Sequence, residues 1–232
     1  MNPTHCLRIP FALGIALAAS VACAGDQDDG HDIDKVNGSI HAEAGQRYGD
    51  LETVNGGIRI ETGAHTGDAE TVNGSIRVHD KAVVGGLGAV NGGIRLGKGV
   101  RAGGSLETVN GDIFVDRGGH LAGDVETVNG AIGLVDTDLA GSIETVNGDI
   151  TVGIGSHVRG GITVIKPNTN QWMPIRIGKK RTPRIIIGPD AVVEGALVFE
   201  REVKLYVHDS ARIGPVTGAT AVRYTSAKVP RD

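Results

Sequence analysis

Acidic side chains recur at a near-constant interval along much of this sequence. The series consists of Glu52, Glu70, Glu107, Glu126 and Glu144, and each stands two residues before a valine. If the interval places these side chains in one column, the column could attract cations or a basic partner. A calcium site, however, needs about six to eight oxygens around one point, and no Gly-Gly-x-Gly-x-Asp run accompanies the series. We therefore expect a solvated row of carboxylates and no metal site.

A basic series follows the same interval. Arg59, Arg77 and Arg95 each stand between two aliphatic residues, and the equivalent places further on hold Phe114 and Gly133. A guanidinium group can bind a carboxylate or a phosphate through two parallel hydrogen bonds. These arginines are therefore candidate ligands of an acidic polymer. They also fit a solvated face whose charge is balanced by the glutamate series.

Histidine would be the first residue to consider for catalysis, because it transfers protons near neutral pH. The histidines in the repeating part and beyond it are His41, His65, His79, His120, His157 and His208. We interpret them as scattered over different faces and corners of the fold. No Ser-His-Asp or Cys-His constellation and no phosphate-cradling loop can be proposed. We expect no enzymatic activity and no cofactor, and the alternative is a carbohydrate-active enzyme acting on polysaccharide.

The elements that position these residues come from a repeated motif. Val-Asn-Gly occurs seven times between Val36 and Ile150, and isoleucine follows one residue later each time. Successive motifs are about 18 residues apart, which indicates a stack of similar structural units. The asparagines and glycines of the motif are Asn37, Gly38, Asn55, Gly56, Asn73, Gly74, Asn91, Gly92, Asn110, Gly111, Asn129, Gly130, Asn147 and Gly148.

Each period divides into three groups of six residues. In the second group the apolar residues stand two apart, as in Ile58 and Ile60, and the third group repeats this in Ala82 and Val84. Such alternation predicts short strands with one buried face. Aromatic residues make up only 3% of the chain, so the core must be narrow and aliphatic. We predict an all-β, three-sided β-solenoid, or β-helix, of nine to ten coils of about 18 residues, and leave its handedness undecided.

The Asn-Gly pair marks the corner after the first strand of each coil. Glycine adopts positive φ without steric cost, so we expect the motif glycines to turn the chain there. The asparagines would stack at the strand spacing of about 4.8 Å, close enough for amide hydrogen bonds between coils. The sequence therefore predicts a structural role for the motif and not a ligand site.

These repeats resemble two bacterial families. The V-N-G-D-I form of the motif, at Val109 to Ile113 and Val146 to Ile150, is similar to the repeats of an adhesin family of exported β-solenoid proteins. This resemblance covers roughly Ile33 to Val164 and implies a solenoid on the envelope side of the membrane. The later run from Ile187 to Gly195 looks more like a bactofilin-type coil.

The first residues are typical of an export signal. Arg8 precedes an apolar run from Ile9 to Ala22, which is too short for a good membrane span. We predict a signal peptide over residues 1–24 and a mature chain beginning at Gly25, without a transmembrane span. The other interpretation is a lipoprotein modified at Cys23. Both cysteines of the chain lie in or at the end of this segment, so no disulfide is expected in the mature protein.

The repeat changes after residue 165. Regular coils are expected over 25–165, a basic insertion with proline and tryptophan over 166–184, longer terminal coils and a cap over 185–224, and a tail over 225–232. Residues 25–160 carry 21 acids and 10 Lys or Arg, a net charge of −11, whereas residues 161–232 carry 6 acids and 12 Lys or Arg, a net charge of +6. Candidate partner-binding residues in the insertion are Trp172, Lys179, Lys180 and Arg181.

This charge asymmetry favours docking of the basic end on an anionic envelope polymer, or self-association of opposed ends. A solvated cap that blocks edge pairing fits the same residues. We do not expect nucleic acid as a partner. Together these patterns predict an exported, non-enzymatic structural or adhesive protein of the cell envelope, in the periplasm, at the outer membrane or on the cell surface. A self-assembling filament scaffold is a further alternative.

Overall fold

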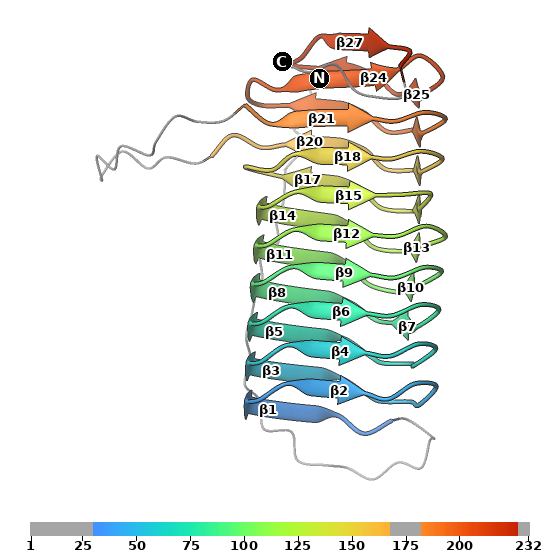
Figure 1. Cartoon of the computed structure of the whole chain (residues 1–232). Coiled ribbons are helices and arrows are strands. Elements are labelled where there is room, and N and C mark those ends of the chain that lie inside the picture. The colour runs from blue at the N-terminus through green and yellow to red at the C-terminus, as the bar shows by residue number, and fades with distance from the viewer. Residues whose placement is uncertain (1–29, 168–181, 227–232) are drawn as a thin grey trace, which may run out of the picture.

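The described residues form a column of stacked coils, as predicted. The computed structural model describes residues 30–167 and 182–226, and these residues form strands and turns without a helix. Figure 1 shows the coils lying one above another, from β1 at one end to β27 at the other. Neighbouring strands in each of the three sheets are parallel. The fold is therefore an all-β, three-sided β-solenoid.

The first of these sheets, sheet A, contains the first strand of each coil. Its order is β1 (Ile33–Asn37), β3 (Leu51–Asn55), β5 (Ala69–Asn73), β8 (Leu87–Asn91), β11 (Leu106–Asn110), β14 (Val125–Asn129), β17 (Ile143–Thr145), β20 (Ile162–Val164), β23 (Leu197–Phe199) and β26 (Val216–Thr217). Equivalent residues pair across neighbouring coils: Leu51 pairs with Ala69, and Glu52 with Glu70.

Sheet B contains the second strand of each coil. Its order is β2 (Ile40–Ala42), β4 (Ile58–Ile60), β6 (Ile76–Val78), β9 (Ile94–Leu96), β12 (Ile113–Val115), β15 (Ile132–Leu134), β18 (Ile150–Val152), β21 (Arg184–Ile187), β24 (Lys204–His208) and β27 (Ala221–Tyr224). Ile58 and Ile60 are buried on either side of an exposed Arg59, so the predicted alternation is present.

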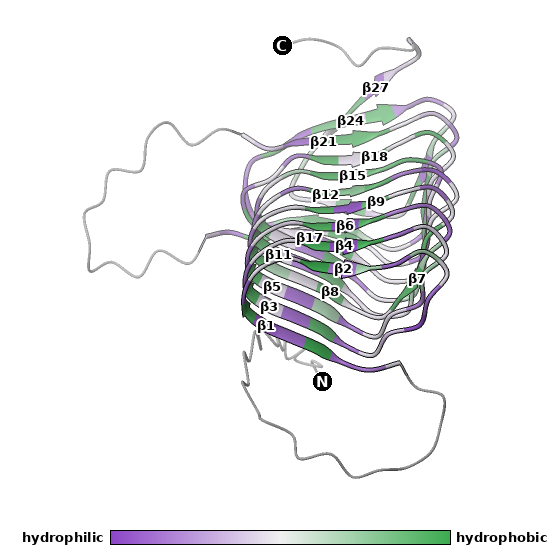
Figure 2. Ribbon diagram, turned by 60° about the horizontal axis from the view of Figure 1, so that its bottom comes forward, coloured by the Kyte–Doolittle hydropathy of each residue, from purple (hydrophilic) through white to green (hydrophobic). Residues whose placement is uncertain are grey.

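Sheet C contains the third, shortest strands. Its order is β7 (Val83–Val84), β10 (Arg101–Ala102), β13 (His120–Leu121), β16 (Asp138–Leu139), β19 (His157–Val158), β22 (Val192–Val193) and β25 (Arg212–Ile213). Single bridges from His65 to Arg47 and Val83 extend the sheet by two coils. The aliphatic side chains of all three sheets meet in one continuous core, and Figure 2 shows hydrophobic and hydrophilic residues recurring at the same places in successive coils.

The asparagine side chains join the coils at the corner between sheets A and B. Asn55 Nδ2 donates to Asn37 Oδ1 at 3.0 Å, and five further bonds of 3.0 to 3.2 Å continue the series to Asn147. At the last coil of the series Arg201 Nη1 donates to Asn147 Oδ1 at 2.7 Å and to the Val146 carbonyl at 2.9 Å. The amides thus form one directional ladder that ends on a guanidinium group.

Six of the seven motif glycines serve a different purpose from the one predicted. Of these seven, only Gly38 has a positive φ, of 114°. At each of the other six, a Cβ atom would lie less than 3.0 Å from the carbonyl oxygen of the motif glycine one coil earlier. Glycine is required there because two backbones approach closely at the corner, and not because the chain turns left-handed.

Left-handed residues form a column at the corner between sheets B and C instead. Gly45, Gly63, Gly99, Gly118 and Gly155 have φ between 65° and 75°, and residues with side chains occupy the same place in other coils. These residues are Lys81, Asp136 and Asp190, with φ of 60°, 46° and 55°. A short polar or flexible side chain tolerates this conformation better than a β-branched one does.

Polar side chains also support the corner between sheets C and A. Asp50 Oδ1 accepts the backbone N–H of Asp68 at 2.8 Å, and Asp124 Oδ1 accepts that of Ser142 at 2.6 Å. Asp32, Asp68, Ser105 and Ser142 accept bonds in the same way in other coils. Many acids of the first two thirds of the chain are therefore structural hydrogen-bond acceptors.

The motif threonines point into the column. Thr71 and Thr108 are at most 5% exposed, and their hydroxyls donate to the carbonyl oxygens of Gly56 and Gly92 at 2.8 and 2.9 Å. Buried hydroxyls are usually hydrogen-bonded, and this contact explains how Thr71 and Thr108 fit an aliphatic core, whereas the buried Thr145 hydroxyl has no such partner.

The terminal coils are less regular. Ile187 pairs with Val207, and Val207 pairs in turn with Arg223, so the last two coils differ in length. The predicted signal peptide, Cys23, and the insertion residues Trp172, Lys179, Lys180 and Arg181 lie outside the described residues.

Candidate functional site

The predicted basic residues lie side by side on the outer face of sheet B. Arg59 pairs with Arg77, and Arg77 pairs with Arg95, on the adjacent strands β4, β6 and β9. We call these three residues the arginine stripe. All three side chains are exposed, and within the described part of the chain none forms an ion pair with a carboxylate.

The glutamate series lies on a different face from this stripe. Glu52 and Glu70 lie on β3 and β5 of sheet A, whereas the arginines lie on sheet B, so the two series occupy different faces. The corner at Asn55 and Gly56 separates the two series, and no ion pair joins them among the described residues.

A shallow depression adjoins the stripe. It has a volume of about 240 Å³ and is lined by Ser39, Gly57, Ile58, Arg59, Ser75 and Arg77. Two guanidinium groups and two serines thus border one concave area. Such a set offers only hydrogen-bond donors and hydroxyls, which suits a ligand that is rich in oxygen acceptors and negatively charged.

The stripe ends at an aromatic residue. The guanidinium carbon of Arg95 lies 5.6 Å from the centre of the Phe114 ring, within the range of a cation–π contact. On the next coil, a Cβ atom at Gly133 would lie 3.3 Å from Phe114 Cδ2, so glycine leaves room for this ring. The outer face of sheet B therefore changes from basic to apolar at β12.

The glutamates are in register on sheet A, and the pKa of four of them is raised. Burial raises the pKa of Glu126 to about 7, and the neighbouring carboxylates of Glu144, Glu107 and Asp124 add to the effect. Burial also raises the pKa of Glu52, Glu70 and Glu144, again with help from nearby acids. The row is therefore less strongly charged near neutral pH than a fully solvated row would be.

Sheet C brings together residues that the sequence interpretation treated as scattered. Its outward positions carry Arg47, His65, Val83, Arg101, His120, Asp138, His157, Val192 and Arg212 in successive coils. The view that the histidines lie on different faces was wrong for His65, His120 and His157. Their spacing of three and two periods was a usable signal, but it required aligning the third strand of each coil as carefully as the second.

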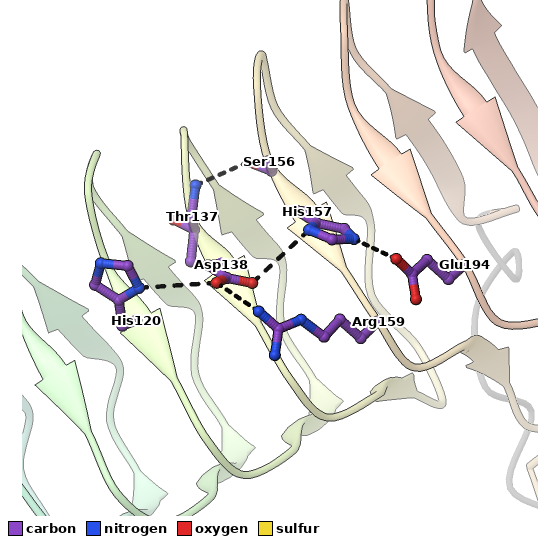
Figure 3. A network of polar contacts seen from close by, with 7 residues as sticks. All are labelled: His120, Thr137, Asp138, Ser156, His157, Arg159 and Glu194. Carbon is purple, nitrogen blue, oxygen red and sulfur yellow. Dashed lines mark hydrogen bonds and ion pairs between the residues drawn. The ribbon is translucent and has the colours of Figure 1, made fainter.

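A network of charges crosses four coils of this face (Figure 3). Asp138 Oδ2 accepts a bond from Arg159 Nη2 at 3.0 Å, and the same oxygen lies 3.9 Å from His120 Nδ1. His157 stands between two acids, with Nε2 at 2.7 Å from Glu194 Oε1 and Nδ1 at 4.0 Å from Asp138 Oδ1. These contacts order Asp138 and Arg159 at one end of a groove.

That groove lies along sheet C from β7 to β16 and has a volume of about 360 Å³. Small residues follow each short strand here, namely Gly103, Ala122 and Ala140, and Arg101 and His120 line the groove beside them. We call this the sheet C groove. It is open to solvent along the rod, so it can hold an extended ligand rather than a compact one.

Two further histidines of the first coils lie near a single acid. His41 Nε2 and His79 Nε2 lie 3.8 and 3.9 Å from the two carboxylate oxygens of Glu61. Across residues 30–167 and 182–226, no cluster of three or more His, Cys, Asp or Glu side chains is placed to hold a metal ion. The same residues contain no helix long and apolar enough to span a membrane.

Comparison of the chain with family models, curated proteins and solved structures finds no match. The resemblances to an exported adhesin family and to bactofilin-type coils therefore stay predictions from sequence.

Proposed function

We propose that this protein is an exported, non-enzymatic rod of the bacterial cell envelope with a structural or adhesive role. In this proposal the rod contacts an anionic envelope polymer through repeated, individually weak interactions.

The arginine stripe is the observation that carries the proposal. Arg59, Arg77 and Arg95 are exposed, stand on successive strands, and have no carboxylate partner among the described residues. Adjacent coils are about 4.8 Å apart, so the three guanidinium groups present a short, regular array of positive charge. An array of this kind fits a polymer with repeated negative charges, because several weak contacts act together.

The rod itself is suited to display such an array. The amide ladder, the corner aspartates and the buried threonines join many neighbouring coils through side-chain hydrogen bonds in addition to the sheet bonds. A stack of this kind is held by nearest-neighbour contacts and keeps its outer faces in register. The described acids with raised pKa values lie in a flat row on sheet A rather than in a concave cluster, which favours a scaffold over a hydrolase.

Binding to dextran sulfate, with uncharged dextran as the control ligand, tests the role of the stripe. Replacing Arg59, Arg77 and Arg95 together by glutamine should weaken binding about tenfold or more, since each exposed charge contact contributes up to ~1 kcal/mol. A matched triple variant at Lys81, Lys98 and Arg117, which are exposed near another corner, changes the net charge equally. Equal weakening by both variants would show that net charge alone drives binding.

Export is tested by cell fractionation and mass spectrometry of the mature N-terminus. A free Gly25 supports a soluble exported protein, and a diacylglyceryl group on Cys23 supports a lipoprotein. An intact N-terminal Met1 in the cytoplasmic fraction would refute export.

A further inference from the structure

The fold does not require the small residues that form the floor of the sheet C groove. The residue after each short strand is Gly103, Ala122 and Ala140 in three successive coils, and then Arg159 and Glu194 in the next two. The same backbone position therefore accepts long side chains. Small residues at three adjacent places keep the groove open although the strand geometry does not demand them.

Gly103 shows this most clearly. A Cβ atom there would meet nothing closer than the Val84 carbonyl oxygen at 3.7 Å, an ordinary contact, and Gly103 is not among the residues with positive φ. Gly85, one coil earlier, is different, because a Cβ atom there would collide with the Asp68 carboxylate. Gly85 is needed by the corner, whereas Gly103 leaves space on the surface.

The groove is bordered by positive charge. Arg101 is exposed, and its guanidinium group forms no ion pair or hydrogen bond with the other described residues. Arg159 stands at one end, where it binds Asp138, the only acid among the described residues that line the groove. His120 lies between these two arginines along the face. The groove therefore complements a negatively charged ligand.

We propose that the sheet C groove binds a carboxylated glycan chain lying along the axis of the rod. Its carboxylates contact Arg101 and His120, and its sugar rings lie over Gly103, Ala122 and Ala140. From Val83 to Asp138 the groove spans three coil spacings, or about 14 Å, which suits a short extended segment. This site is separate from the arginine stripe and goes beyond the proposed function by assigning a ligand class to a second face.

Other extended ligands fit the groove less well. A peptide that adds a strand needs an open sheet edge, but each strand beneath the groove from β10 to β16 has neighbours on both sides. Single-stranded nucleic acid is normally held by aromatic side chains that stack on the bases, and the described residues that line the groove include no Phe, Tyr or Trp.

Calorimetric titration with an oligogalacturonate tests the proposal, with its methyl ester as the uncharged control ligand. Arg101→Gln should weaken binding about tenfold, and Ala122→Phe should reduce it at least as much by filling the groove. Ala122 is exposed, so the phenylalanine does not disturb the core, and circular dichroism checks the fold. Arg212→Gln is the matched control, because Arg212 lies in the same outward column but outside the groove. The affinity of this variant for the oligogalacturonate should stay within about twofold of the parent's.

Several outcomes would overturn the proposal. The proposal fails if the methyl ester or a single-stranded oligonucleotide binds as tightly as the oligogalacturonate. It also fails if Ala122→Phe binds the oligogalacturonate as tightly as the parent protein does. If the triple variant of the arginine stripe abolishes oligogalacturonate binding and Arg101→Gln does not, the glycan binds sheet B, so this inference fails and the proposed function stands. If the groove variants lose the oligogalacturonate while dextran sulfate binding is insensitive to the stripe variant, the proposed function fails and the inference stands.

Discussion

Replacing Gly92 by asparagine should destabilise the rod far more than the same change at Gly99. Gly92 belongs to the Val-Asn-Gly motif and has no positive φ, whereas Gly99 has a φ of 65°. Asparagine is one of the few residues that adopt left-handed conformations readily. If the motif glycines served to turn the chain, asparagine would be tolerated at both places.

The expected difference follows from the contacts at the two corners. A Cβ atom at Gly92 would fall less than 3.0 Å from the carbonyl oxygen of Gly74, so the two coils would have to move apart. Movement of the Gly92 backbone would strain two neighbouring hydrogen bonds. Gly92 N donates to the Asn110 carbonyl at 3.1 Å, and Thr108 Oγ1 donates to the Gly92 carbonyl at 2.9 Å. Losing these and overpacking the corner should cost about 3–5 kcal/mol.

At Gly99 the change should be mild. The nearest atom to a Cβ there is Lys81 Cγ at 3.7 Å, and Lys81 itself adopts the left-handed conformation one coil earlier. We expect a cost of about 1 kcal/mol or less, partly offset because asparagine restricts the unfolded chain more than glycine does.

Equilibrium unfolding in urea, followed by circular dichroism, measures both costs. The slope of the unfolding free energy against urea concentration must be compared between variants, because a stack of coils can lose two-state behaviour when one corner is weakened. The reasoning is refuted if Gly92→Asn and Gly99→Asn are equally mild, or if Gly99→Asn is the more harmful variant.

Three further predictions concern side chains that recur from coil to coil. Glu126 has a pKa raised from 4.5 to about 7, so the parent protein loses stability as pH rises through that window. Glu126→Gln should therefore match the stability of the parent at pH 4 and exceed it by ~1–2 kcal/mol at pH 8. Thermal melts that show no pH-dependent difference between the two proteins would contradict this. Asn91→Ala removes two amide bonds and should cost ~1–2 kcal/mol in urea unfolding, whereas a cost near zero would mean that the ladder adds nothing. Thr108→Val leaves the Gly92 carbonyl without its hydroxyl donor and should lower the free energy of unfolding by ~1 kcal/mol. Ala89 occupies the equivalent place one coil earlier, so the fold tolerates the loss of this hydroxyl. A stabilised variant would refute this account.

The sequence alone was sufficient for the architecture. A period of about 18 residues and the pairing of buried residues such as Ile58 and Ile60 predicted a three-sided β-solenoid, because strand alternation requires one buried face and a repeated unit requires a stack. The position of the asparagines at one corner also followed from the period. These features depend on local patterns that repeat along the chain.

Some predictions failed because they depend on contacts between coils. The role of Gly92 is set by the carbonyl of Gly74, which lies one coil earlier in the sequence but is adjacent in space. The left-handed residues, such as Gly99 and Lys81, lie at a different corner, where the chain leaves sheet B. Propensity for positive φ describes a single residue, so it could not distinguish a turn from a close approach of two backbones.

The surfaces show the same division between local pattern and spatial arrangement. The arginine stripe could be predicted, since its three residues share one place in a clearly aligned strand. The sheet C groove could not, because the short third strands have only one buried residue each and the period lengthens between Arg101 and His120. Sequence alone determined that residues repeat and which of them face inward. Only the tertiary structure decided which outward side chains share a face, because that depends on how each corner turns and where the extra residues are accommodated.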